Sequence, residues 1–218
     1  ADSAALLATP AVPGLADLGA EVAEAWAPIL KDFELRGCRP ICELRTTNGP
    51  APLPHPGVSA AQVYEQLRRS DGDSAIGRLW RGKAVTELSE PEWAPLGEGL
   101  ARCLSFRLPL KPQPMAPKST RISIVYHLAG GGDGPVVLTS ITRSLDVPYS
   151  SSFTVQAQMV FRPEPDGLAG ESLVGVCWSG RCLVRGLIEG ASRSEATESF
   201  EELVRLLCDV IYAGADAF

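Results

Sequence analysis

Histidine is scarce in this sequence, and the cysteines lack the spacing of a metal site. The 218 residues include two histidines, His55 and His127, and six cysteines, none of which belongs to a CxxC pair. Both histidines lie far along the chain from the cysteine pairs 38/42 and 177/182, so no local pattern indicates zinc. We therefore expect no metal and no cofactor, and interpret the cysteines as reduced side chains with a structural role.

Long hydrophobic runs and an excess of positive charge are also missing. Arg, Glu, Gly or Pro interrupts the apolar stretches well before the ~20 residues that a membrane-spanning helix requires. The 20 Lys and Arg residues are outnumbered by 26 Asp and Glu, for a formal net charge of −6, which disfavours nucleic acid as the main partner. The chain starts at Ala1 instead of Met, which we interpret as processing or fragmentation, so the compartment is left open.

The first 57 residues differ in character from the rest and are predicted to form an extension, 1–57. Residues 1–14 are small and punctuated by proline, as in an extended arm. Apolar residues at helical spacing then predict an amphipathic helix that carries Trp26 and contains Pro28. The run NGPAPLPHPG at 48–57 is typical of a linker, which places a domain boundary at its end.

Residues 58–212 are predicted to form one α+β domain, followed by a tail at 213–218. From about residue 85 to residue 182, apolar and polar residues alternate along successive segments, most regularly in 152–162. The glycine-rich segment 130–134 has the composition of a hairpin turn between two of these segments. The pattern predicts a curved antiparallel sheet of about six strands with one apolar face.

Helical periodicity flanks this predicted sheet on both sides. Before it, Ser59 and Gln62 have the spacing of a capping box, and 74–82 predicts a second short helix. After it, the period changes from two to 3.6, and 183–212 predicts one helix of ~45 Å. A curved sheet that grips one long helix often leaves an apolar hollow between them, where we expect an apolar ligand.

No group of residues indicates catalysis. Glu189 and Glu195 are expected on the solvated face of the long helix, where paired carboxylates are usually surface charges. The serines 150–152 have no His or Lys nearby to activate a nucleophile. His127 falls on the polar side of its predicted strand and is expected at the surface. We therefore expect a protein that is not an enzyme.

Several short motifs occur in an order that is typical of one protein family. The most distinctive is Asp146-Val147-Pro148-Tyr149, which leads into the strand predicted from Phe153. The others are VSAAQVY at 58–64, RCLSFRLPL at 102–110, PKST at 117–120, VGVCW at 174–178 and IEGA at 188–191. With these motifs, residues 58 to about 209 resemble the VASt domain, the START-like lipid-binding module of the Lam and Aster sterol transporters and of related plant proteins.

The resemblance implies a helix-grip fold that binds a sterol or similar lipid in an apolar cavity and transfers it between membranes. It implies cavity walls from the sheet and the long helix, at Phe106, Ile124, Tyr126, Phe153, Val155, Met159, Leu187, Ile188 and Ala191. It also implies a lid with an apolar tip and flanking lysines for an anionic membrane surface, formed by Lys111, Met115, Ala116, Pro117 and Lys118. Ala116 and Ser150 stand where the family pattern has glycine.

An alternative function stays open, that of a non-catalytic structural subunit of a larger assembly with a filled pocket. Residues 1–57 lie outside the resemblance, and Trp26 is a residue type that anchors protein partners. A third class, a small-molecule enzyme on a START-like fold, is disfavoured because no acid and base residues converge. The expected partners are thus a lipid and a membrane surface, or a protein that binds residues 1–57.

Overall fold

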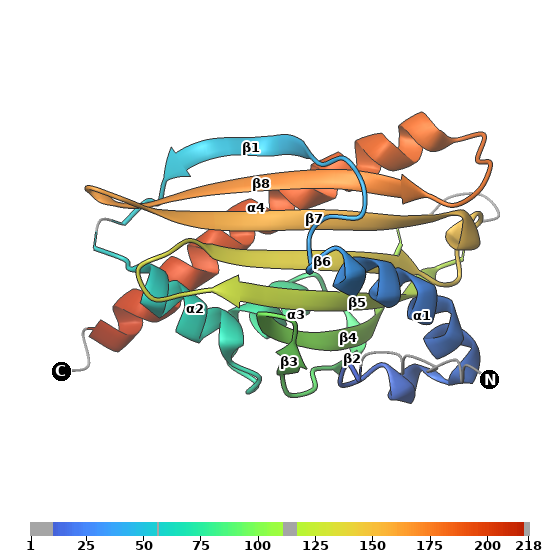
Figure 1. The fold of residues 1–218 in the computed structure, drawn as a ribbon, viewed down its shortest axis with the longest axis horizontal. Helices are drawn as coiled ribbons and strands as arrows, with labels where there is room; N and C mark the ends of the chain where they lie inside the picture. The colour runs from blue at the N-terminus through green and yellow to red at the C-terminus, as the bar shows by residue number, and fades with distance from the viewer. Residues whose placement is uncertain (1–10, 56, 111–116, 216–218) are drawn as a thin grey trace, which may run out of the picture.

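The computed structural model describes residues 11–55, 57–110 and 117–215, and its main element is a curved antiparallel sheet (Figure 1). The strands are β1 (Arg45–Pro52), β2 (Thr86–Ser89), β3 (Ala94–Leu96), β4 (Gly99–Pro109), β5 (Ser119–Gly130), β6 (Val136–Ser144), β7 (Phe153–Glu164) and β8 (Gly167–Trp178). Their order is β1-β8-β7-β6-β5-β4-β2, with β3 paired to β4. The antiparallel sheet is confirmed, but the described residues form eight strands rather than about six.

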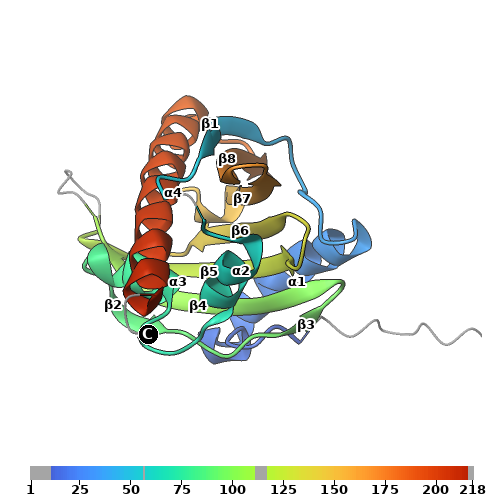
Figure 2. The ribbon, with the colours of Figure 1, turned by 90° about the vertical axis from the view of Figure 1, so that its left-hand side faces the viewer.

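Helices cover both faces of this sheet (Figure 2). They are η1 (Ala16–Leu18), α1 (Ala20–Leu35), α2 (Ala60–Arg68), α3 (Ala75–Gly82), η2 (Ser150–Ser152) and α4 (Arg185–Ala215). The long helix α4 lies along the concave face, here called the inner face, and α1 lies on the opposite, outer face. One unbroken C-terminal helix therefore crosses the sheet, as the change of period predicts.

The proline-rich run that predicts a linker is in large part a strand. β1 pairs with β8 from Arg45↔Val174 to Pro52↔Ala169, with two irregularities in register. β1 lies at the edge of the sheet, so only one of its sides pairs with another strand. Pro50 and Pro52 lack an N–H group, which an edge strand tolerates because no strand on its open side needs that donor. The linker prediction is thus wrong for the residues within β1, because the extension contributes an edge strand to the sheet.

The amphipathic helix α1 packs on the outer face, and Trp26 is completely buried there. Its indole N–H donates to the hydroxyl of Ser123 on β5 at 3.1 Å. The apolar cluster around it combines α1 with strands β4 to β6 and includes Leu30, Phe33, Ala101, Cys103, Val125 and Ile141. The expectation that Trp26 anchors a partner protein is therefore wrong, because its ring has no exposed surface. α1 also continues through Pro28 without interruption.

His127 is buried rather than exposed, which contradicts the expectation from strand alternation. Its Nε2–H donates to the carbonyl of Leu96 at 3.1 Å, and the edge of the ring packs against Phe33 at 5.5 Å between centroids. The alternation correctly places His127 on the face opposite the inner core. That face is covered by α1, so the polar side of β5 is a second buried surface.

The second half of α4 closes the inner core, whereas much of its first half is exposed. Phe200, Leu203 and Leu207 are buried in a cluster that also contains side chains of α2, α3 and the strands. Leu187, in the first turn, is 73% exposed. This uneven packing leaves the space described below between the first half of α4 and the sheet.

The capping box predicted before α2 is confirmed. The backbone N–H of Gln62 donates to Ser59 Oγ at 3.2 Å, and the backbone N–H of Ser59 donates to Gln62 Oε1 at 2.9 Å. The predicted hairpin is also confirmed, with Gly130 at a φ of +89° and too close to Pro135 for any side chain. These local signals act within a few residues, so they could be read from the sequence alone.

Candidate functional site

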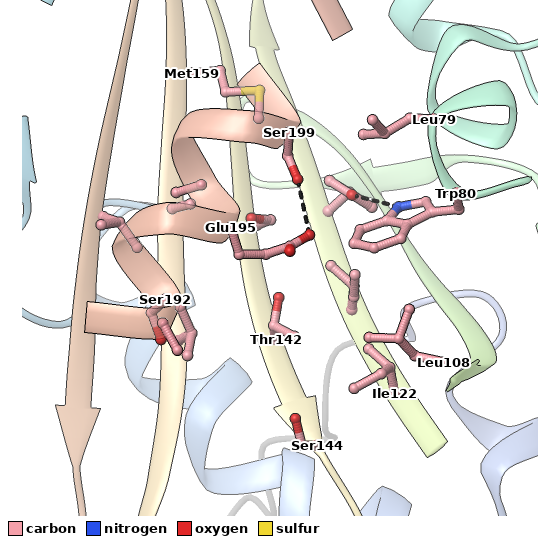
Figure 3. Close-up of a pocket in the computed structure, with 18 of the residues that line it drawn as sticks. Leu79, Trp80, Leu108, Ile122, Thr142, Ser144, Met159, Ser192, Glu195 and Ser199 are labelled. Carbon is pink, nitrogen blue, oxygen red and sulfur yellow. Dashed lines mark hydrogen bonds between the residues drawn. The ribbon is translucent and has the colours of Figure 1, made fainter. Parts of the chain in front are cut away.

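A cavity of about 380 Å³ lies between the inner face of the sheet and the first half of α4 (Figure 3). Strands β5, β6 and β7 form its floor, and Leu79 and Trp80 of α3 form one wall. Its volume falls within the ~300–1,000 Å³ of small-molecule sites. Ala191 and Glu195 of α4 line the cavity and are also exposed, so the cavity opens to solvent along this helix.

Most of the residues expected in the walls do line this cavity. They are Ile124, Tyr126, Phe153, Val155, Met159, Ile188 and Ala191. Phe106 lies instead in the core behind Trp80, with 4.5 Å between the ring centroids. Leu187 is exposed because one step along a helix turns a side chain by about 100° away from its neighbour Ile188. Both are therefore corrections to the expected set of wall residues.

Several cavity residues were missed from the sequence, and a number of them are polar. Ser140, Thr142 and Ser144 line the floor along β6, and Glu195 and Ser199 line the wall on α4. The signal for the β6 residues was their alternation with buried outer-face residues such as Ile141. Hydroxyl side chains do not by themselves predict the wall of an apolar cavity, even on the correct face of a strand.

The aromatic wall is held by a buried hydrogen bond. Trp80 Nε1–H donates to Tyr126 Oη at 3.0 Å, joining α3 to the centre of β5 (Figure 3). Burial raises the pKa of Tyr126 to about 12, although the bond from Trp80 opposes the shift. Tyr126 therefore stays protonated at physiological pH, and its hydroxyl is a neutral polar group inside an apolar chamber.

A charged cluster connects α3 to α4 at the edge of the cavity. Lys83, which follows α3, donates to Glu195 and, at 2.8 Å, to Ser199 Oγ. Ser199 Oγ in turn donates to Glu195 Oε1 at 3.1 Å. Glu195 is thus exposed, as its position on the polar side of the helix predicts, but it also forms part of the cavity wall.

A second charged cluster connects the N-terminus of α3 to strand β4. The guanidinium of Arg102 is fully buried on the inner face of β4, with Nη2 3.0 Å from Glu90 Oε1 and its centre 4.4 Å from the Trp93 ring. Burial lowers the pKa of Arg102, and the charge of Glu90 opposes this shift. Glu90 also bonds to Ser74, the N-cap of α3, so this cluster positions the helix that carries Trp80.

The motif Asp146–Tyr149 lies in the connection between β6 and β7 and not in the cavity. Asp146 Oδ1 accepts from Arg121 Nη2 at 2.7 Å, and its Oδ2 accepts the backbone N–H of Arg121 at 2.9 Å. These bonds lower the pKa of Asp146. Tyr149 has a left-handed backbone with φ of 64° and is exposed. The motif therefore holds a turn beside the last residues of β6.

The expected lid is described only at its second end. Lys111, Met115 and Ala116 lie outside the described residues. Pro117 is half-buried and Lys118 is exposed. The carbonyl of Lys118 accepts the backbone N–H of Leu110 at 2.9 Å, which joins the two ends of this loop beside the end of β4.

Neither metal-binding clusters nor membrane-spanning helices occur in the part of the chain that the structure describes. No group of three or more His, Cys, Asp and Glu side chains there is arranged to hold a metal. No described helix combines the length and the hydropathy needed to cross a membrane. The six cysteines are free thiols, of which Cys38, Cys103 and Cys208 are buried.

The sequence between the linker and the middle of α4 matches a known domain. Residues 56–195 fit the model of VASt, the VAD1 Analog of StAR-related lipid transfer domain, over more than half of the chain. The chain belongs to the VASt family. VASt domains form a lipid-binding family, so the cavity between α4 and the sheet is the candidate lipid site. The match includes all strands of the cavity floor and the α4 residues up to Glu195.

Two solved structures are similar to this VASt protein at low sequence identity. The crystal structure of the Mll3558 protein from Rhizobium loti has 14% identity and a TM-score of 0.42, and covers 75% of this chain and 97% of its own. An uncharacterized protein from Rhizobium leguminosarum has 11% identity and a TM-score of 0.36, and covers 76% of this chain and 95% of its own.

Proposed function

We propose that this chain binds a sterol or a similar rigid lipid in the cavity beneath α4, without chemical change to it. The observation that carries the proposal is a mainly apolar cavity of about 380 Å³ that opens to solvent along one helix. A rigid apolar ligand gains roughly 25 cal/mol for each Å² removed from water, and its hydroxyl needs a partner inside. Tyr126 supplies such a partner at the aromatic wall.

In this proposal the ligand body lies along the floor. Ile124, Val155 and Phe153 contact its faces, Met159 closes the inner end, and Ile188 covers it from α4. The polar groups on the walls are hydroxyls and one carboxylate that Lys83 already neutralises. This set suits the orientation of a ligand better than proton transfer, which needs a free acid or base beside the reacting atom.

A binding experiment with dehydroergosterol, an intrinsically fluorescent sterol, tests the cavity. Ala157 lies on the floor, so Ala157→Trp fills the chamber with an indole and should weaken binding by at least about tenfold. Ala20→Trp makes the same change at an exposed position on α1 and should bind like the wild type. Equal binding by all three proteins would exclude the cavity as the sterol site.

We further propose that the chain transfers its lipid between membranes. Leu183, Val184 and Leu187 are exposed apolar side chains at the start of α4, next to the cavity residue Ile188, with Leu183 92% exposed. Apolar side chains beside an opening favour insertion into the acyl boundary of a bilayer. A ligand could then pass between bilayer and cavity without crossing water.

A liposome assay tests transfer separately from binding. Leu187→Asp should slow dehydroergosterol transfer between vesicles and leave binding in solution unchanged, because Leu187 does not line the cavity. Leu35→Asp is the matched control, since Leu35 is 72% exposed but lies at the end of α1 on the outer face. If Leu187→Asp transfers sterol at the wild-type rate, this entrance is not the membrane contact.

A further inference from the structure

The inner face of β6 changes from apolar to hydroxylated where it enters the cavity. Val136 and Leu138 are buried in the core, whereas the next three residues on that face are Ser140, Thr142 and Ser144. All three line the cavity and are only partly buried. In Figure 3 Thr142 and Ser144 follow one another along the strand.

Apolar side chains flank this row of hydroxyls on the neighbouring strands. Thr142 pairs with Ile124 on β5 and with Val155 on β7. Ser144 pairs with Ile122 on β5. The floor of the cavity is thus a single polar strip between two apolar strips, rather than a uniformly apolar surface.

These hydroxyls have no partner within the protein as described. Among the described residues, no group forms a hydrogen bond with Ser140 Oγ, Thr142 Oγ1 or Ser144 Oγ. The contrast lies on the same strand, where Thr139, which faces outward, accepts from Gln158 Nε2 at 3.2 Å. The cavity hydroxyls therefore remain available to whatever fills the chamber.

Tyr126 extends this polar strip at its inner end. It pairs with Ser140 in the β5–β6 register and is only 5% exposed. Its Oη accepts from Trp80, but among the described residues nothing accepts the proton of its own hydroxyl. A buried donor that faces a cavity and lacks an acceptor costs free energy until a ligand or a water supplies one.

The spacing of the strip defines the shape of a complementary ligand. Alternate residues on a strand lie about 6.7 Å apart, so the three β6 hydroxyls span about 13 Å. A ligand with a single hydroxyl satisfies one of these groups and leaves the others against its apolar body. A ligand with several hydroxyls on one side satisfies several of them, while the rest of its surface contacts the apolar strips.

On the basis of the proposed lipid-binding function, we infer that the cavity selects steroids or similar rigid amphiphiles that carry several hydroxyl groups on one side. The hydroxyls of Ser140, Thr142, Ser144 and Tyr126 receive that side, and the flanking apolar strips receive the apolar remainder of the ligand. Selectivity thus depends on β6, and binding of the apolar body depends on the cavity as a whole.

Lithocholate and cholate provide a matched pair of probes, since they share one ring system and side chain but carry one and three hydroxyls. Calorimetric titrations below the micellar concentrations give the ratio of the cholate to the lithocholate dissociation constant. The variant Ser140→Ala/Thr142→Val/Ser144→Ala should raise this ratio by at least about tenfold, because it removes up to three hydrogen bonds. Thr139→Val, on the outer face of β6, should leave it unchanged.

Two further measurements keep the outcomes distinct. If the triple variant unfolds, the isosteric single variant Thr142→Val takes its place and should raise the ratio by about threefold. An unchanged ratio in a folded variant, or a failure of cholate to bind, overturns the inference. Dehydroergosterol binding then shows whether the proposed function survives, because a monohydroxylated sterol does not depend on the whole strip.

Discussion

Trp26 donates its indole N–H to the hydroxyl of Ser123 at 3.1 Å, across 97 positions of sequence. Both residues are completely buried between α1 and the outer face of β5. The bond fixes the rotation of α1 on the sheet, because the ring can reach Ser123 from only one face of the helix. Helix α1 of the N-terminal extension is therefore part of the folded domain, which leaves the structural-subunit alternative without its expected anchor.

The burial of Trp26 predicts a large loss of stability when the ring is removed. Trp26→Ala should lower the free energy of unfolding by about 3–5 kcal/mol through a cavity under α1. Leu35→Ala, on the same helix but 72% exposed, should change it by less than about 0.5 kcal/mol. Urea unfolding of both variants checks the expectation, and equal effects would mean that α1 is not docked as described.

The buried pair of Arg102 and Glu90 predicts strong coupling between the two residues. Arg102→Met removes the closer cation from the buried carboxylate of Glu90 and leaves only the half-exposed Arg81, whose Nη2 lies 3.5 Å from Glu90 Oε2. It should destabilise the protein by about 3 kcal/mol. The double variant Arg102→Met/Glu90→Gln leaves no buried charge and should be less destabilised than the sum of the single variants. Additive effects in a urea-unfolding cycle would contradict the coupling.

The ion pair of Asp146 predicts a loss of stability in acid. Its folded pKa lies below the ordinary value of 3.8, so the pair contributes fully above that value and is lost as pH falls through the folded pKa. Because Arg121 is half exposed, we expect less than about 1 kcal/mol. Asp146→Asn and Arg121→Gln should each flatten the thermal-unfolding profile between pH 5 and pH 2, and an unaltered profile would refute the role of the pair.

His127 predicts a separate pH dependence closer to neutrality. Burial lowers its pKa below 6.5, so the folded state holds the neutral imidazole while the unfolded state takes up a proton. Stability is therefore fully present above pH 6.5 and falls as pH drops towards the folded pKa. His127→Gln should remove this slope from the thermal-unfolding profile. The matched variant His55→Gln keeps His127 and should retain the slope. If His55→Gln also loses the slope, His127 is not its source.

The sequence alone was sufficient for features that depend on neighbours along the chain. The capping box at Ser59 and Gln62, the hairpin at 130–134 and the single long helix after residue 183 all follow from periodicity or turn chemistry within a short window. The family could also be recognised from the sequence, because short motifs in a fixed order, such as the one around Asp146, need no knowledge of their contacts. The VASt match over residues 56–195 confirms that resemblance. Alternation likewise assigned the inner faces of β5 and β7.

Contacts between distant segments decided the rest. Alternation separates the two faces of β5, but only the docking of α1 makes the face of His127 and Ser123 a buried one. The proline-rich run becomes part of strand β1 because it pairs with β8 at the edge of the sheet, where missing N–H groups are tolerated. The uneven packing of α4 leaves hydroxyls of β6 facing a cavity rather than a core. Each outcome depends on which surface covers which, and a local pattern of residues does not contain that information.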